Sequence, residues 1–130
     1  MRLIEGRKLN GVAGADITRG VPCKVDISSI ISVTPYTAAP SNQVVVLADK
    51  LEDKPYGQIP ATINSGDKVI YAYQGLFEYN DGTLAAAVKE GDLVEWTTTG
   101  VQKLALGQRA GYVAGVSGKT VLIQFDGLNK

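Results

Sequence analysis

The sequence predicts an all-β protein of one domain, built as a small antiparallel β-barrel or sandwich. Its length of 130 residues suits a single domain. Glycine occurs 15 times and interrupts the chain at short, fairly even intervals. The runs between the glycines are rich in Val, Ile, Thr and Tyr, which is typical of short strands joined by tight turns. No segment keeps apolar residues at helical spacing for three turns, so no long helix is expected.

Two hexamers, at residues 66–71 and 91–96, repeat the pattern Gly-Asp-x-Val-x-aromatic. A looser third copy starts at Gly20. The glycine accepts the left-handed backbone that ends the preceding segment, and the aspartate can hydrogen-bond its own following backbone. We therefore expect structural turns here, and not acids that take part in catalysis. The turn positions are Gly66, Asp67, Gly91 and Asp92.

The N-terminal third divides into a lead-in and the first strands. Residues 1–20 are broken by glycine and mixed in charge, so we expect an extended, irregular N-terminal arm. Residues 21–130 then form the β domain. Residues 21–26 alternate in polarity and residues 27–34 are rich in β-branched side chains, and both segments are predicted strands.

The middle of the chain continues the pattern of short strands. Residues 35–42 are a loop by composition. Residues 43–48 are dominated by apolar side chains, which favours a strand buried on both faces or at an interface. Residues 68–74 alternate well between two faces, and residues 76–79 follow as a further strand.

The sequence Asn-Asp-Gly-Thr at residues 80–83 is the strongest hairpin signal in the chain. Asp81 and Gly82 readily supply the positive φ values of a type I′ turn, so both are expected to be structural turn residues. Residues 84–88 contain three alanines and fit either a strand or a single helical turn.

Two more hairpins are predicted near the C-terminus. Residues 93–99 and 101–106 flank Gly100, and residues 111–115 and 120–125 flank a short glycine-containing turn. About ten short strands in all favour a small antiparallel barrel or sandwich, with β-tulip and SH3-like forms among the alternatives.

Composition argues against most kinds of chemistry. Lys plus Arg and Asp plus Glu both total 13, so the net charge is zero and the basic surface of a nucleic-acid-binding protein is not expected. There is no histidine, the commonest general base and metal ligand.

Cys23 is the only cysteine, which excludes an intrachain disulfide and a zinc site built from cysteines, and its apolar neighbours predict burial. The apolar runs are too short to span a bilayer, and the N-terminus lacks the apolar core of a signal peptide. We expect no enzyme activity, cofactor, metal, nucleic-acid partner or membrane partner.

The motifs that could carry chemistry fail on spacing or context. The sequence Gly-Val-Ser-Gly-Lys-Thr at residues 115–120 resembles a P-loop, but that motif needs glycine where Val113 stands. A strand pattern follows it, whereas a P-loop opens a helix, so a β-turn is expected. Glu95 lies between Val94 and Trp96 and is expected to point outward.

The aromatic residues leave one alternative function open. Most of them are expected to fill the core or a subunit interface. An exposed row could instead stack on carbohydrate or another small ligand, which would make the protein a β-barrel binding module. The row would consist of Tyr71, Tyr73, Tyr79 and Trp96.

Six short stretches follow one another in a characteristic order. They are Ala-Asp-Ile-Thr-Arg-Gly-Val at 15–21, Leu-Ala-Asp-Lys at 47–50, Pro-Tyr-Gly-Gln-Ile-Pro-Ala at 55–61, Ser-Gly-Asp-Lys-Val at 65–69, Lys-Glu-Gly-Asp-Leu-Val at 89–94 and Gly-Gln-Arg-Ala-Gly-Tyr-Val at 107–113. From residue 16 onward this order of elements resembles the small capsid decoration, or cement, proteins of tailed bacteriophages. The sequence departs from the family pattern where Gly-Val-Pro at 20–22 replaces the first Gly-Asp, and in the loop at 35–42.

The resemblance implies a non-enzymatic virion protein on the outer capsid surface, made in the host cytoplasm. It would bridge neighbouring subunits of the major capsid protein, stabilise the shell and associate as a homotrimer. We expect the arm to be disordered over about its first 15 residues in the free protein and to lie along a capsid edge as an added strand. The expected contact residues are Arg2, Leu3, Ile4, Arg7, Lys8 and Leu9.

Overall fold

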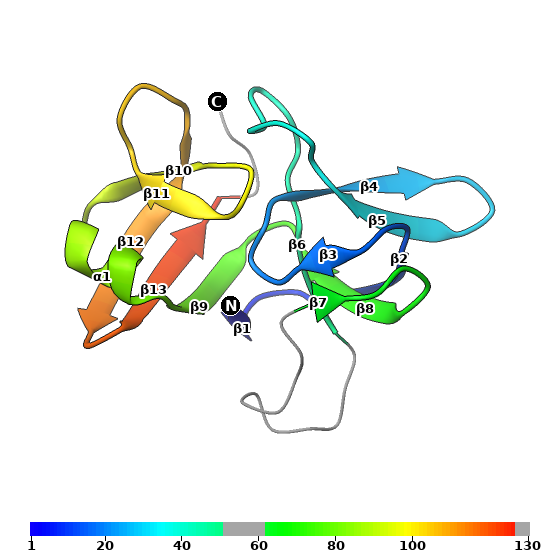
Figure 1. Ribbon diagram of the computed structural model, residues 1–130, viewed down its shortest axis with the longest axis horizontal. Helices are drawn as coiled ribbons and strands as arrows, with labels where there is room; N and C mark the ends of the chain where they lie inside the picture. The colour runs from blue at the N-terminus through cyan, green and yellow to red at the C-terminus, as the bar shows by residue number, and fades with distance from the viewer. Residues whose placement is uncertain (51–61, 127–130) are drawn as a thin grey trace.

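The computed structural model describes residues 1–50 and 62–126 (Figure 1). The prediction of an all-β protein is confirmed, since strands dominate and one short helix occurs within those ranges. The strands form a six-stranded sheet, a five-stranded sheet and a two-stranded sheet. The six-stranded sheet with the helix makes one lobe of the molecule, and the other two sheets make a second lobe beside it.

The five-stranded lobe has the strand order β4-β5-β2-β8-β6. All its neighbours are antiparallel except β2 and β5, which run parallel. The predicted strands at 21–26 and 27–34 appear as the β4–β5 hairpin, in which Val25 pairs with Val33. This lobe also holds the two-stranded sheet of β3 and β7. Its strands are β2 (Leu9–Ala13), β3 (Ile17–Thr18), β4 (Cys23–Ile27), β5 (Ile31–Pro35), β6 (Leu47–Lys50), β7 (Thr62–Ile63) and β8 (Lys68–Ala72).

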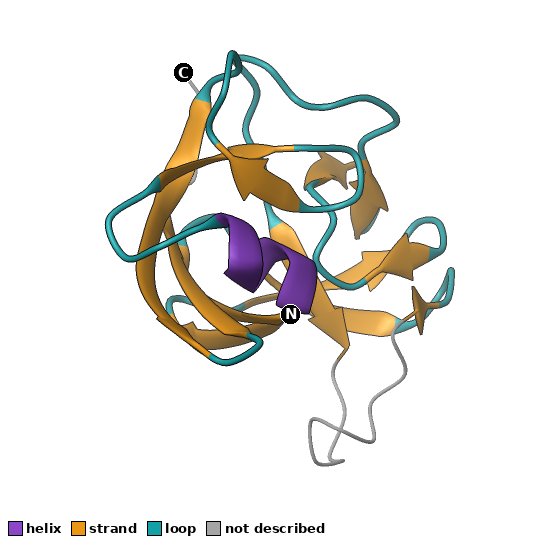
Figure 2. Cartoon of the chain, turned by 60° about the vertical axis from the view of Figure 1, so that its left-hand side comes forward, coloured by secondary structure: helices purple, strands orange, loops and turns teal. Residues whose placement is uncertain are grey.

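The six-stranded lobe is antiparallel throughout, in the order β1-β9-β13-β12-β10-β11. Its sheet curls around a core that the helix also contacts (Figure 2). The two predicted C-terminal hairpins are confirmed as β10–β11 and β12–β13. The elements are β1 (Arg2–Glu5), β9 (Gly75–Asn80), α1 (Gly82–Ala87), β10 (Leu93–Trp96), β11 (Val101–Lys103), β12 (Arg109–Ser117) and β13 (Thr120–Phe125).

The expected hairpin turn at Asp81 and Gly82 is wrong, because Asp81 caps the N-terminus of α1. Its Oδ1 accepts hydrogen bonds from the backbone N–H groups of Thr83 at 3.0 Å and Leu84 at 3.1 Å. Aspartate is as good a helix cap as it is a turn residue, and the alanines that follow it are the strongest helix formers. The segment at 84–88 therefore starts as helix, and β9 pairs with β13 instead.

The apolar run at 43–48 passes between two hydrophobic cores. Val45 and Leu47 belong to the core of the six-stranded lobe. Val46 and Ala48 belong to the core of the five-stranded lobe. Because successive side chains of an extended chain point to opposite sides, one segment supplies both cores in turn. The predicted burial on both faces is confirmed for these four side chains, which are at most 3 % exposed.

The irregular arm expected over residues 1–20 is also wrong, because this segment forms strands inside both lobes. β1 pairs with β9, and β2 lies between β5 and β8. Gly11 explains the error, since a Cβ there would approach the Tyr71 ring and the Ile31 carbonyl to 3.2 Å. The glycine marks a place where neighbouring strands pack closely, and not a flexible arm. Strand pairing therefore does not separate residues 1–20 from residues 21–130.

Candidate functional site

The first Gly-Asp pair closes a four-residue turn that starts at Asn64. Gly66 has a φ of +91°, the left-handed value that the third position of a type II turn requires. The backbone N–H of Asp67 donates to the carbonyl of Asn64 at 3.0 Å, and the Asp67 Oδ2 accepts from the Asn64 N–H at 3.0 Å. Lys50 lies 3.6 Å from the same carboxylate oxygen. The carboxylate is thus engaged in holding the turn.

The second Gly-Asp pair repeats this geometry in the other lobe. Gly91 again has a φ of +91°. Asp92 exchanges the same two hydrogen bonds with Lys89, both at 3.0 Å, and Lys103 lies 3.6 Å from its carboxylate. The strand pairing also matches, because Val69 lies opposite Gly11 and Val94 lies opposite Gly111. Each motif therefore lies at the start of a strand with a neighbour on either side: β8 lies between β2 and β6, and β10 lies between β12 and β11. Neither aspartate carboxylate is without a partner.

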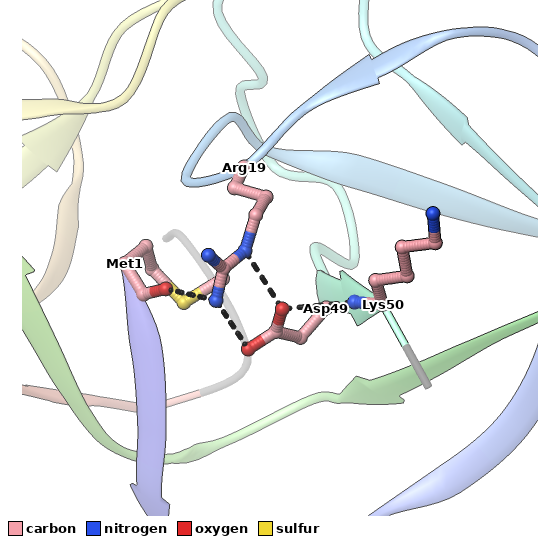
Figure 3. Close-up of polar contacts among 4 residues, drawn as sticks. All are labelled: Met1, Arg19, Asp49 and Lys50. Atoms are coloured by element: carbon pink, nitrogen blue, oxygen red, sulfur yellow. Dashed lines mark hydrogen bonds and ion pairs between the residues drawn. The ribbon is translucent and has the colours of Figure 1, made fainter. Parts of the chain in front are cut away.

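A buried ion pair lies where the two lobes meet (Figure 3). The Arg19 guanidinium contacts both carboxylate oxygens of Asp49, at 2.7 and 2.8 Å. It also donates to the carbonyl of Met1 at 2.9 Å, and the Lys50 N–H donates to Asp49 at 2.8 Å. The Arg19 and Asp49 side chains are 6 % and 12 % exposed. The pair joins the start of β1, the turn before β4 and the strand β6.

A polar cleft of about 610 Å³ opens beside this ion pair. Arg19, Tyr79, Asp81 and Lys119 are among its lining residues. The Asp81 carboxylate caps α1 and the Tyr79 hydroxyl donates to the carbonyl of Gly20 at 3.0 Å, so both groups have structural partners. No pair of side chains here has the arrangement of a nucleophile and its base. Within the described ranges, no three His, Cys, Asp or Glu side chains are placed to hold a metal ion.

Glu95 is buried, which corrects the expectation that it points outward. Its side chain turns into the loop between β11 and β12, and the residue is 6 % exposed. The carboxylate accepts hydrogen bonds from the Gly107 N–H at 2.6 Å and from the Gln102 side chain at 2.8 Å. Val94 and Trp96 on either side belong to the core of the six-stranded lobe, so the loop covers Glu95 on the opposite face of β10. The alternation in the sequence does not reveal that a loop covers this carboxylate.

The aromatic residues mostly fill the cores, as expected. Tyr71, Tyr79 and Trp96 are at most 9 % exposed, and Trp96 stacks on Phe125 with ring centroids 4.6 Å apart. Of the four residues suggested for carbohydrate stacking, only Tyr73 is exposed, at 38 %. A platform for sugar rings needs several exposed faces, so no observation favours the alternative function.

Cys23 and the glycine-rich hairpin behave as packing and turn residues. Cys23 is fully buried, and burial raises the pKa of its thiol to about 12, so it is neither a nucleophile nor a ready metal ligand. The resemblance to a P-loop ends in the β12–β13 turn, where Gly118 has a φ of +60° and Thr120 starts a strand. A β-turn at this position is confirmed.

The residues expected to contact a capsid lie along β1, β2 and their connection. Ile4 is 43 % exposed, Arg7 and Lys8 are exposed, and Leu9 is half-buried against the core of the five-stranded lobe. The backbones of Arg2 and Leu3 pair with β9, and their side chains lie outside the described part of the structure. The structure thus places these residues on two folded strands and in the short connection between them.

The acidic side chains described above all have partners within the fold. The acids of both Gly-Asp motifs hold turns, Asp81 caps a helix, Asp49 is paired and Glu95 fixes a loop. No helix of the described residues is long and apolar enough to cross a membrane.

Comparison with known proteins assigns the chain to a family. Residues 25–121 match the family model described as phage cement protein. The chain therefore belongs to the phage cement protein family, which indicates a structural role in association with a capsid. The matched range contains both Gly-Asp turns, and the family-like stretch at 55–61 falls in it but outside the described residues. A search of the curated proteins finds no match.

Proposed function

We propose that this protein binds the outer surface of a phage capsid, bridges neighbouring subunits of the major capsid protein and stabilises the shell. The match to the cement protein family over residues 25–121 is the observation that carries this proposal. The protein would be made in the host cytoplasm and act on the virion as a homotrimer. Many copies on a symmetric shell supply avidity, so each single contact can be weak.

The strand β1 is the part that we propose to contact the shell. It stands at the edge of the six-stranded sheet, and within the described chain only β9 pairs with it. An edge strand offers a row of unpaired backbone N–H and C=O groups to a further strand. Ile4 adds an exposed apolar side chain, and Arg7 and Lys8 add positive charge beside it. An extended segment of a capsid subunit would pair with β1, which replaces the expectation of a free arm.

Binding to shells that lack the protein tests this proposal. Mixing purified protein with undecorated capsids should give saturable, stoichiometric co-sedimentation and a higher temperature of capsid disruption. The variant Ile4→Asp should bind more weakly, because a charge would face the incoming apolar surface. Val116→Asp is the matched control, since Val116 is 37 % exposed on β12, which β9 and β13 separate from β1. Failure of the wild-type protein to bind its own capsid would refute the proposal.

A further inference from the structure

The strand β4 forms one edge of the five-stranded sheet, and one of its two sides is open. Among the residues that the structure describes, β4 pairs with β5 along its length, and on its other side only Cys23 has a partner, which is Val46. An open edge strand offers its backbone N–H and C=O groups to a further strand. Lys24, Asp26 and Ile27 are exposed along β4, so its edge is accessible.

The register of β4 determines which of its backbone groups face the open side. Cys23 and Val46 exchange two backbone hydrogen bonds, at 2.9 and 2.8 Å, so the N–H and C=O groups of Cys23 point away from β5. These groups alternate from residue to residue between the two sides of an antiparallel strand. The N–H and C=O groups of Val25 and Ile27 therefore point to the open side as well, and the residues between point theirs to β5.

A cavity of about 500 Å³ lies beside this open side, and Val25, Val44 and Tyr73 are among its lining residues. The pairing of Cys23 with Val46 does not continue to Val25 and Val44, so the two segments diverge and both line the cavity. Val44 is 48 % and Tyr73 is 38 % exposed. The volume is several times that of one aliphatic side chain, so it suits consecutive residues of an extended segment.

We propose that an extended segment of a second subunit of the major capsid protein adds to β4 at Val25 and Ile27. The inference rests on the proposed function, in which one capsid subunit pairs with β1. β1 and β4 belong to different lobes, so the two open edges lie on separate parts of the molecule (Figure 1). A protein that bridges two subunits needs two contacts, and in strand addition the main-chain hydrogen bonds provide the affinity.

The residues around the edge indicate what the segment carries and why a second copy of β4 does not fit. Lys24 lines the cavity, is exposed and has no carboxylate partner among the described residues, so an acidic side chain of the segment would pair with it. A two-fold pair of β4 strands centred on Val25 would place Ile27 of one copy opposite Cys23 of the other. The backbone groups of Cys23 are already bonded to Val46.

Hydrogen exchange resolved to single amides tests this geometry on the wild-type protein. When the protein is bound to undecorated capsids, the amides of Val25 and Ile27 should exchange at least about 10-fold more slowly than in the free protein, because the segment would hold them. The amides of Lys24 and Asp26 should be slow in both states, because they face β5. If the Val25 and Ile27 amides stay fast in the bound protein, or become slow without capsids at high protein concentration, the inference is overturned.

Two variants of the β4–β5 hairpin separate its edge from its tip. Ile27→Asp should weaken binding to undecorated capsids by about 10- to 100-fold, because a charge replaces an aliphatic side chain that the segment covers. Ile30→Asp is the matched control and should bind like the wild type, since Ile30 is 56 % exposed in the same hairpin but lies outside β4. Far-ultraviolet circular dichroism checks that both variants are folded.

The temperature of capsid disruption separates this inference from the proposed function. At saturating concentration, Ile27→Asp should still coat the capsids through β1 but raise the disruption temperature less than the wild type, because it no longer bridges two subunits. If Ile27→Asp binds and stabilises like the wild type, or if Ile30→Asp weakens binding as much, the inference fails while the proposed function stands. If the wild type itself does not bind its capsid, both fail.

Discussion

Replacing Arg19 should strongly destabilise the protein, because it leaves the Asp49 carboxylate buried without its cation. Arg19 supplies two of the three close contacts to this carboxylate, and the Lys50 N–H at 2.8 Å supplies the third. Both side chains of the pair are at least 88 % buried, given exposures of 6 % and 12 %. Removing one partner of such a pair costs about 3–5 kcal/mol. We therefore expect Arg19→Met to lower the free energy of unfolding by that amount.

Removing both charges should recover most of the free energy of unfolding that the single variant loses. The double variant Arg19→Met, Asp49→Leu replaces the pair by apolar side chains of similar size, which is often neutral. It still loses the hydrogen bond to the Lys50 N–H, worth about 1 kcal/mol. The two single variants and the double variant form a cycle, whose coupling energy should be at least about 2 kcal/mol.

Urea unfolding followed by tryptophan fluorescence measures these differences, since Trp96 is buried beside Phe125. Arg19→Met should also lower the melting temperature by about 10–20 °C. The control is Arg109→Met, because Arg109 and Asp126 form a similar pair at 3.0 Å with exposures of 46 % and 42 %. Exposed pairs contribute less than about 1 kcal/mol. If Arg19→Met costs no more than Arg109→Met, or if the double variant is as unstable as the single ones, the reasoning is refuted.

Three further predictions concern the turns, the thiol and the N-terminal strands. Gly66→Ala and Gly91→Ala should each lower the free energy of unfolding in urea by about 1–2 kcal/mol, because both glycines have a φ of +91°. Gly115→Ala is the control and should be nearly neutral, since the space around its Cβ is open. Clearly unequal losses at the two turns would argue against their shared geometry. Burial raises the Cys23 pKa from 9.0 to about 12, so the unfolded state ionises first and the contribution of the thiol to stability is lost as pH rises from 9 towards 12. The loss should be smaller in Cys23→Ser but not absent, because burial also raises the pKa values of Tyr36 and Tyr71. Rapid alkylation of the folded protein at pH 8 would contradict the burial. The amides of β2 should exchange slowly in the free protein by hydrogen-exchange mass spectrometry, whereas fast exchange throughout residues 1–20 would restore the disordered arm.

Strands and turns could be predicted from the sequence where the pattern that specifies them lies within a few consecutive residues. The apolar run at 43–48 predicted burial on both faces, and the two cores on either side of it account for this pattern. The glycines at positions 100 and 118 correctly predicted hairpin turns, because glycine adopts a positive φ readily whatever the rest of the chain does. The Gly-Asp pattern also showed where two turns would precede two strands.

The errors arose where a distant part of the chain decides the outcome. Gly11 suggested flexibility, but its neighbours Ile31 and Tyr71 come from strands far along the chain. Asp81 fits a turn and a helix cap equally well, and the pairing of β9 with β13 decides between them. Glu95 is buried because the loop between β11 and β12, which lies several residues further along the chain, covers its carboxylate.

The central position of β2 has a consequence for how the protein is made. A ribosome releases residues 9–13 long before β8, one of the two strands that flank them, which spans Lys68–Ala72. β1 must wait longer still, because its partner β9 ends at Asn80. Contacts between parts of the chain so far apart form slowly, since a long loop must close before they are made. β1 and β2 are thus synthesised well before β9 and β8, and their pairing cannot be completed until more than half of the 130 residues have been translated.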